Sequence, residues 1–356
     1  MTKKTLKLLL PVLLIGILMF TLTACGGGGS DTTDNNQPAN DGGSSDDNSS
    51  AKEEKWISIA TASTAGAWYP IGGGIAATIN RHVPNIKANA ETGAASLENV
   101  RNLVEGNVEV VFAQPDISMK AYQGLDMYEG KQQKNLRGLM SSYPTTAQFI
   151  TVEGTGIEGL EDAVGKSIGV GAPGSGTEVF SKTVLEEYGI TYDDVEEQFL
   201  GVPDHVTGLK DGNVDLSMSL MPVPTGAFTE LAVTHNVKLL ELTPEAQQTL
   251  ADKLPGFFPF TIPANAYKGQ TEPIPTLAYR GLIMTTDEMS EEDAYQIVKA
   301  TYDYRDEWKD VHVVVKNMTL ETAMEGMTIP LHPGAIKYYK EKGMDIPDEL
   351  VPPEMK

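Results

Sequence analysis

A glycine-rich stretch at residues 165–178, GKSIGVGAPGSGTE, constrains the fold more than any other part of the sequence. Residues 168–170 are apolar and predict a strand. The glycines predict a turn into a helix that opens at Ser175 to Thr177, where either residue can be the cap, and continues to Tyr188. Glycine lets a backbone come close to a ligand, and the first helical amides carry partial positive charge. The stretch therefore predicts an anion or carboxylate site, with an ordinary turn as the alternative.

The same glycines match other motifs only in part. Gly169, Gly171 and Gly174 fit the dinucleotide-binding pattern G-x-G-x-x-G, which is a weak signal when it stands alone. The phosphate-binding motif that ends in Gly-Lys-Ser/Thr is absent. Pro173 and Thr177 stand where the nucleophile elbow G-x-S-x-G needs glycine. The stretch thus gives no specific support for an enzyme.

The first 25 residues predict export. Lys3, Lys4 and Lys7 precede an apolar run at 8–22, which is too short and wrongly flanked for a membrane-spanning helix. Residues 22–25, Leu-Thr-Ala-Cys, resemble the bacterial lipobox, in which the cysteine is lipidated and becomes the mature N-terminus. We therefore predict a lipoprotein signal peptide at 1–24 and lipidation of Cys25, the only cysteine in the chain. The alternative, a buried core cysteine, fits poorly beside the glycines and serines that follow.

Residues 25–55 are predicted to be a lipidated, disordered tether, because 26–50 are almost wholly Gly, Ser, Asp, Asn and Thr and cannot bury apolar surface. The predicted location is extracytoplasmic, with the chain anchored by lipid on Cys25 to the periplasmic side or outer face of the cell membrane. The formal net charge of −22 predicts a surface that repels nucleic acid and anionic lipid, so we expect no nucleic-acid partner. An anionic ligand would need local donors such as helix N-termini.

Beyond the tether, strands alternate with helices in two successive runs. This alternation predicts an α/β fold with parallel sheets covered on both faces, arranged as two lobes. Pro70 is expected to open the first helix and Ser96 to cap the second. Separate strands are expected at 136–142 and 148–152, with a hinge at Tyr143-Pro144 between them. Extended segments at 257–266 and 274–285 are expected to return between lobes. The predicted boundaries are 56–144 with 280–356 for lobe 1 and 145–279 for lobe 2.

In a doubly wound sheet, ligands lie beyond the carboxyl ends of the strands. The loops predicted there are small, hydroxylic, amide or aromatic in character, at 63–69, 92–96, 114, 171–177 and 221–225. None supplies a catalytic set, and the five histidines are scattered with no metal-ligand spacing. We therefore predict no enzyme, no cofactor and no metal site. His332 beside Pro333 is expected to be a helix cap or a surface residue.

Five motifs together resemble the TAXI-type solute receptors of TRAP transporters: STAGAWYPIGGG at 63–74, ASLEN at 95–99, FAQPD at 112–116, VGAPGSGTE at 170–178 and IPLHPG at 329–334. The resemblance covers about 56–343. It implies a two-lobed, type II periplasmic-binding-protein fold with the ligand cleft between the lobes. It also implies a receptor that closes on a small organic acid, a dicarboxylate such as 2-oxoglutarate or glutamate. Its partners would be TRAP-type membrane permease subunits, driven by an ion gradient.

The resemblance carries ligand contacts over to eight positions of this chain. The ligand-binding residues it implies are Thr64, Trp68, Tyr69, Ser96, Gln114, Ser175, Gly176 and Thr177. Alternatives stay open, since Trp68 and Tyr69 can instead pack between the lobes. Ser96 can be a helix cap alone, and Gln114 can merely satisfy a backbone group. Trp68 also departs from the relatives, which often have tyrosine there, and Tyr143 at the hinge is a further candidate.

Two other functions remain possible from the sequence. A receptor of the same fold that feeds an ATP-driven importer or a sensor shares every physical feature above, and only the TAXI-like motifs count against it. A secreted lipoprotein hydrolase would need a nucleophile elbow or a metal set, and the sequence offers neither.

Overall fold

The computed structural model describes residues 54–356. The predicted signal peptide, Cys25 and nearly all of the predicted tether therefore lie outside the described residues. Within 54–356, no helix is both long enough and apolar enough to cross a membrane.

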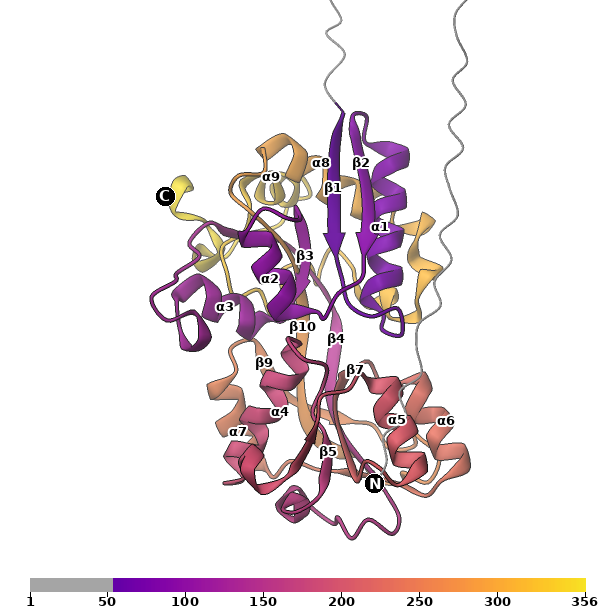
Figure 1. Ribbon diagram of the computed structural model, residues 1–356. Helices are drawn as coiled ribbons and strands as arrows, with labels where there is room; N and C mark the ends of the chain where they lie inside the picture. Colours follow the sequence, from indigo (N-terminus) through magenta and orange to yellow (C-terminus); the bar gives the residue numbers. More distant parts are fainter. Residues whose placement is uncertain (1–53) are drawn as a thin grey trace, which may run out of the picture. The chain divides into compact units, whose positions relative to one another are not determined.

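Ten strands in the described part of the chain join into one sheet (Figure 1). Most of them are rich in β-branched, aromatic and other apolar residues, which favour a half-buried pleated surface. The strands are β1 (Lys55–Ala60), β2 (Ile86–Glu91), β3 (Val110–Ala113), β4 (Leu136–Val152), β5 (Ser167–Gly169), β6 (Glu196–Gln198), β7 (Leu216–Met221), β8 (Val237–Leu240), β9 (Phe257–Ile262) and β10 (Ile274–Thr286). Their order is β2-β1-β3-β10-β4-β7-β5-β6, with β8 paired to β4 and β9 paired to β10.

Helices connect these strands. The α-helices of residues 54–356 are α1 (Trp68–His82), α2 (Ser96–Val104), α3 (Pro115–Gln123), α4 (Gly176–Glu187), α5 (Val202–Asp211), α6 (Gly226–Thr234), α7 (Pro244–Lys253), α8 (Glu291–Asp303) and α9 (Pro333–Glu341). Short 3₁₀ helices are η1 (Asp126–Tyr128), η2 (Leu160–Ala163), η3 (Tyr192–Asp194), η4 (Arg305–Glu307), η5 (Lys309–Val311), η6 (Val313–Asn317), η7 (Asp348–Leu350) and η8 (Pro353–Met355).

Two long strands run through both halves of the sheet. β4 has 17 residues and β10 has 13, and the two pair antiparallel with each other. One end of β10 pairs with β3 and the other with β9, while β4 pairs with β7 and β8 only in its second part. We call β1–β3 with α1–α3, α8 and α9 the first half, and β5–β9 with α4–α7 the second half. The fold is therefore a two-lobed α/β fold in which β4 and β10 connect the lobes (Figure 1).

The predicted break at Tyr143-Pro144 is wrong, because β4 continues through it. Proline interrupts a regular ladder, but the pairing with β10 is irregular at this point. Arg280 is opposite Pro144 and Leu282 is opposite Ser141, so one residue of β10 faces two residues of β4. This bulge accommodates the proline inside a central strand.

The sheet is mixed rather than wholly parallel. β1 pairs parallel with β2 and β3, and β5 pairs parallel with β6 and β7, as the alternation of strands and helices predicts. The pairings of β4 and β10 are antiparallel, because β4 leads from the first half into the second and β10 leads back. Two segments, 257–266 and 274–285, were predicted to lead back between the lobes. β10 does lead back to the first half, whereas β9 pairs with the first residues of β10.

Several helices begin at a capping side chain. The side-chain oxygens of Ser175, Thr243 and Ser290 each accept a hydrogen bond from the backbone amide three residues further on. This confirms Ser175 as the cap of α4. His332 caps α9, because its Nδ1 accepts from the Gly334 amide at 3.1 Å, as expected for this histidine.

Two other predicted helix starts are wrong. α1 begins at Trp68, so Pro70 is its third residue, a position in the first turn where no backbone amide is needed. α2 begins at Ser96 itself, after Ala95 at a φ of +76°. The Ser96 hydroxyl does not cap the helix, because it accepts a hydrogen bond from the Gln114 amide at 3.1 Å.

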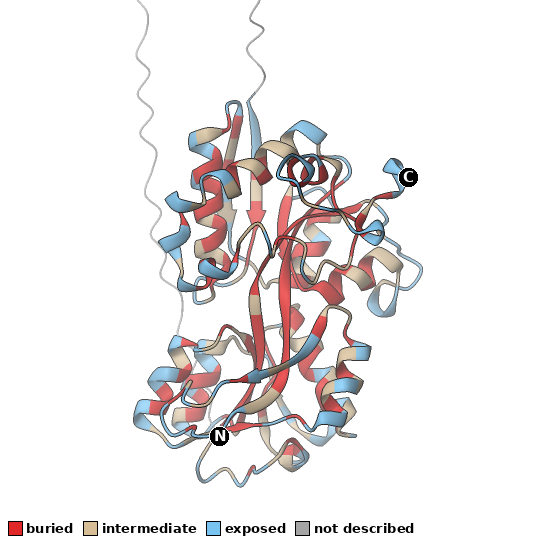
Figure 2. Ribbon diagram, turned by 180° about the vertical axis from the view of Figure 1, so that it is seen from behind, coloured by how far each residue is buried: buried red, intermediate tan, exposed pale blue. Residues whose placement is uncertain are grey.

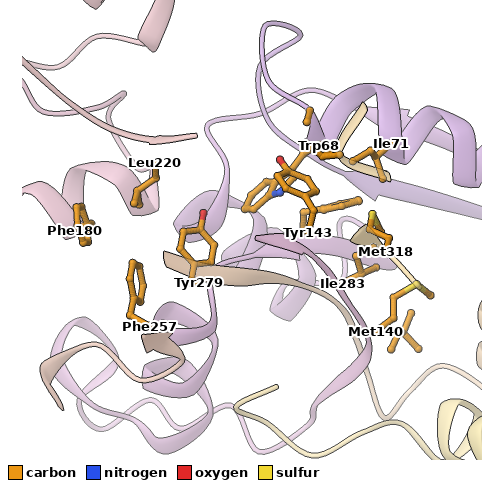
Figure 3. Close-up of a cluster of buried hydrophobic side chains, with 14 of the residues drawn as sticks. Trp68, Ile71, Met140, Tyr143, Phe180, Leu220, Phe257, Tyr279, Ile283 and Met318 are labelled. Atoms are coloured by element: carbon orange, nitrogen blue, oxygen red, sulfur yellow. The ribbon is translucent and has the colours of Figure 1, made fainter. Parts of the chain in front are cut away.

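The core follows the crossing strands. Figure 2 shows β4 and β10 buried along most of their length. A row of aromatic rings, Phe149, Phe180, Phe257 and Tyr279, has successive centroids 6.1, 5.4 and 4.8 Å apart. These rings come from β4, α4, β9 and β10, so the row ties the core of the second half to the junction between the halves. Figure 3 shows three of them, Phe180, Phe257 and Tyr279.

Candidate functional site

A cavity of about 390 Å³ lies where the two halves meet. The first half and the crossing strands contribute residues 62–63, 65–68, 93–95, 114, 143, 145, 279 and 312, and the second half contributes 171–172, 175–177, 200–203, 220–222 and 224–227. Most of these residues follow the carboxyl ends of β1, β2, β3, β5, β6 and β7. The cavity is thus at the place where an α/β sheet is expected to bind a ligand.

Five of the eight predicted ligand-binding residues line this cavity: Trp68, Gln114, Ser175, Gly176 and Thr177. The other three do not line it. Thr64 is exposed in the loop before α1, Tyr69 is half-buried in the first turn of α1, and Ser96 is buried. Ligand contact stays a prediction for all eight.

The N-terminus of α4 forms one wall. Ser175 Oγ accepts from the Glu178 amide at 3.2 Å, which satisfies one amide of the first turn. The amides of Gly176 and Thr177 have no acceptor within the described residues. Gly171, at a φ of +111°, makes the preceding turn, and a Cβ atom there would be 2.8 Å from the Glu178 amide nitrogen. Two amides at the positive end of a helix are therefore available to a ligand.

Gln114 reaches α4 from the first half. Its backbone is fixed on both sides, because its amide donates to Ser96 Oγ at 3.1 Å and its carbonyl accepts from Ser118 Oγ at 2.7 Å. Its side chain is 2% exposed and lies against Gly176, where a Cβ atom has no room. Gln114 Oε1 makes no hydrogen bond of ordinary geometry within 54–356, although the Tyr279 phenol is close enough to interact. Ser96 thus supports Gln114 from outside the cavity.

Three aromatic side chains gather at the junction of the halves: Trp68, Tyr143 and Tyr279 (Figure 3). Trp68 opens α1, Tyr143 is in the bulge of β4, and Tyr279 is on β10. A Cβ atom on Gly281 would be 3.1 Å from Trp68 Cζ2, so this glycine makes space for the indole. Burial raises the pKa of both tyrosines above the usual value of 10, so their phenols stay protonated and can donate hydrogen bonds.

No Lys, Arg, Asp or Glu of the described residues lines this cavity. Six helices nevertheless begin at it, since the cap or first residues of α1 to α6 belong to the lining. Within residues 54–356 there is also no group of three or more His, Cys, Asp or Glu that could hold a metal ion. The arrangement suits a neutral or anionic molecule, because helix N-termini and neutral donors surround the space and no side chain is available to balance a cation.

Sequence reasoning missed three parts of the lining. Residues 200–203 open α5, and the sequence could have shown them because they follow a predicted strand. Thr145 and Tyr279 line the cavity because β4 and β10 cross between the halves, which no local pattern indicates. His312 follows no strand, and no signal in the sequence distinguishes it from the other histidines.

Solved structures with a similar arrangement include several binding proteins. The periplasmic aliphatic sulphonate binding protein SsuA from Escherichia coli has 13% identity and a TM-score of 0.42, over 81% of this chain and 79% of that one. A putative L-cystine ABC transporter protein from Listeria monocytogenes has 14% identity and a TM-score of 0.47, over 76% and 99%. PhnD1 from Prochlorococcus marinus, solved with methylphosphonate, has 7% identity and a TM-score of 0.49, over 74% and 91%.

The sequence itself gives the family. Residues 59–343 match the NMT1-like family, from within β1 to the end of α9 and beyond. This match covers most of the chain and all the residues that line the cavity. The chain belongs to the NMT1-like family.

Proposed function

We propose that this chain is an extracytoplasmic, lipid-anchored receptor that captures a small organic acid between its two halves and delivers it to a membrane permease. The observation that carries the proposal is the chemistry of the cavity. Among the described residues no charged side chain lines it, and six helices begin at it.

An anion in this cavity would be held by fixed dipoles. The N-terminus of a helix acts as about half a positive elementary charge, and its free amides point along the axis toward a ligand. The amides of Gly176 and Thr177 offer such donors. The indole of Trp68 in the first half and the phenol of Tyr143 on β4 add neutral donors. Because these donors do not titrate near pH 7, we expect a flat affinity between neutral and mildly alkaline pH.

Contacts across the junction support capture by closure. A Cβ atom on Gly256 of the second half would be 2.5 Å from Pro115 Cβ of the first half. Val179 of α4 packs against an apolar cluster of the first half that includes Ile117. Since β4 and β10 are the connections between the halves, bending of these two strands would open and close the cavity. We propose the lobes as 56–144 with 280–356 and 145–279, in line with this crossing.

The five motifs shared with TAXI-type receptors support a narrower proposal. The solute is a dicarboxylate such as 2-oxoglutarate or glutamate, and the partner is a TRAP-type permease driven by an ion gradient. A receptor for an ATP-driven importer or a sensor remains the alternative, because it would have the same cavity. The lining does not favour a hydrolase. Ser175 Oγ is engaged in the cap of α4, and no lining serine pairs with His312 in residues 54–356.

Native mass spectrometry of the purified chain tests the proposal directly. A small acid that co-purifies with the protein, and is released on denaturation, is the expected result. Calorimetry with L-glutamate and 2-oxoglutarate then measures affinity, and small-angle scattering should give a smaller radius of gyration with bound acid than without. A protein that binds no acid in either measurement would contradict the proposed function. Binding without any change in the scattering profile would contradict closure alone.

A further inference from the structure

The segment after α8 brings an additional side chain to the cavity. This segment, residues 305–317, contains η4 to η6 and packs on α1 (Figure 1). A Cβ atom on Gly74 of α1 would be 3.1 Å from Trp308 Cβ and 3.3 Å from Val311 Cγ1. The indole of Trp308 donates to the Thr301 carbonyl at 3.0 Å, which ties the segment to α8. The chain just before His312 is therefore held against α1 and α8.

Arg305 fixes the other end of this segment. Its guanidinium donates to the carbonyls of Met318 and Val315, each at 2.7 Å. Both ends of the loop that carries His312 are thus tied down. The imidazole is consequently carried by a loop that hydrogen bonds and packing hold on both sides.

The hydrogen bonding of the ring determines which nitrogen is available. His312 Nδ1 accepts from the Val314 amide at 3.4 Å, which makes His312 the cap of η6 and places the proton on Nε2. Nε2 is the far end of the ring, and it has no hydrogen-bond partner among the described residues. The ring is half-buried and lines the cavity. Burial also lowers the pKa of His312, so the ring is neutral near pH 7.

We propose that His312 is a ligand contact, and that its Nε2–H donates a hydrogen bond to an acceptor oxygen of the bound acid. The inference rests on the proposed function, because it assigns a residue of the same cavity. It places a side-chain donor on a segment of the first half that follows no strand. A solute with an acceptor at this position is favoured over one with an apolar group, because a bound apolar group would shield the Nε2–H from water without giving it an acceptor.

Two substitutions separate the proposed role of His312 as a donor to the ligand from its role as the cap of η6. His312→Asn keeps a side-chain oxygen that can accept from the Val314 amide, but it loses the distal N–H. His312→Gln reaches about as far as Nε2 and restores an N–H there, but it is a poorer cap. Calorimetry on the full chain with L-glutamate, 2-oxoglutarate and succinate compares both variants with the parent, and thermal unfolding checks that each is folded.

For the acid that the parent binds best, His312→Asn should lower the affinity roughly tenfold, and His312→Gln should stay within about threefold of the parent. Parent-like affinity in His312→Asn would overturn the inference. So would an equal loss in both variants, because it would trace the effect to the ring rather than to the donor. In either case binding by the parent would leave the proposed function standing. A parent that binds none of the three acids would contradict the proposed function, and the inference with it.

Discussion

Gln114 of the first half lies directly over the first turn of α4 in the second half: a Cβ atom on Gly176 would be 2.4 Å from Gln114 Cδ. The two residues line the same cavity, so the contact between the halves lies at its wall. The absence of a side chain at Gly176 is therefore a requirement of this closed arrangement, in addition to any requirement of a ligand.

Gly176→Val should abolish measurable binding of the acid while the protein stays folded. The valine would push Gln114 away and crowd the approach to the α4 amides. Gly73→Val in α1 is the matched control, because a Cβ atom there meets no atom within 4 Å and the residue does not line the cavity. Calorimetry measures the affinity of both variants for the acid. Tight binding by Gly176→Val would place the anion site elsewhere.

Ser175→Ala should have a smaller effect on binding than Gly176→Val, together with a measurable loss of stability. It removes a hydroxyl from the cavity, for a loss of affinity of roughly tenfold. It also removes the cap of α4, which should lower the free energy of unfolding by about 1 kcal/mol. Ser175→Thr keeps the cap and is the control for stability. Denaturant unfolding and calorimetry measure the two effects separately, and an unchanged stability would argue against the cap.

Asp116→Asn should stabilise the protein at neutral pH. The carboxyl is fully buried in α3, and burial raises its pKa from the usual 3.8 to about 6, despite the nearby Lys120. Between about pH 4 and pH 6 the folded chain therefore holds a proton on Asp116 that the unfolded chain has lost. Above pH 6 the carboxyl is charged in both states, and its burial opposes folding by about 3 kcal/mol. The gain in stability of Asp116→Asn over the parent should grow from near zero at about pH 3 to its full value at about pH 7. Urea denaturation of both proteins at several pH values measures this difference in the free energy of unfolding. A difference that does not change with pH would contradict a buried charge at Asp116.

Arg280→Met should destabilise the junction strongly. The guanidinium is nearly buried, and its Nη1 donates to the Ser142 carbonyl at 2.8 Å and to the Asn317 carbonyl at 3.2 Å. Its Nε pairs with Glu325 Oε2 at 2.7 Å. Loss of the donors should lower the free energy of unfolding by about 2–4 kcal/mol. Glu325→Gln should cost less than about 1 kcal/mol, because the Glu325 side chain is 56% exposed. Equal losses in urea denaturation would show that the carbonyl contacts do not matter.

Cys25→Ser should leave an unlipidated precursor that does not label with palmitate. Cys25 lies outside the described residues, so this prediction rests on the sequence at 22–25. Because the chain has no other cysteine, label on the variant equal to that on the parent would rule out lipidation at this position. Membrane fractionation of the two proteins is the companion measurement.

The features that the sequence predicted well depend on neighbouring residues. The Ser175 cap is an example, because a serine before a helical pattern and the amide it binds are only three residues apart. The loops at the strand ends were predicted for the same reason, since each follows its strand directly in the chain.

The features that it did not predict depend on distant contacts. Proline at 144 signals the end of a strand, and only the bulge opposite Arg280 allows β4 to continue. Ser96 stands where a cap is expected, but its hydroxyl binds the Gln114 amide 18 residues away. His312 reaches the cavity because its segment packs on α1, more than 200 residues earlier in the chain.

The crossing strands β4 and β10 also determine how this protein can be divided. A cut at the junction would pass through two central strands. Each fragment would then expose strand edges with unpaired backbone groups, which promote aggregation. Neither half can therefore be exchanged or expressed as a separate domain by cutting at a single linker. The pairing of β3 with β10 joins segments about 170 residues apart, so the first half cannot complete its sheet until the chain has emerged as far as β10. If the chain is exported as we propose, the two halves would assemble only after β10 has been translocated.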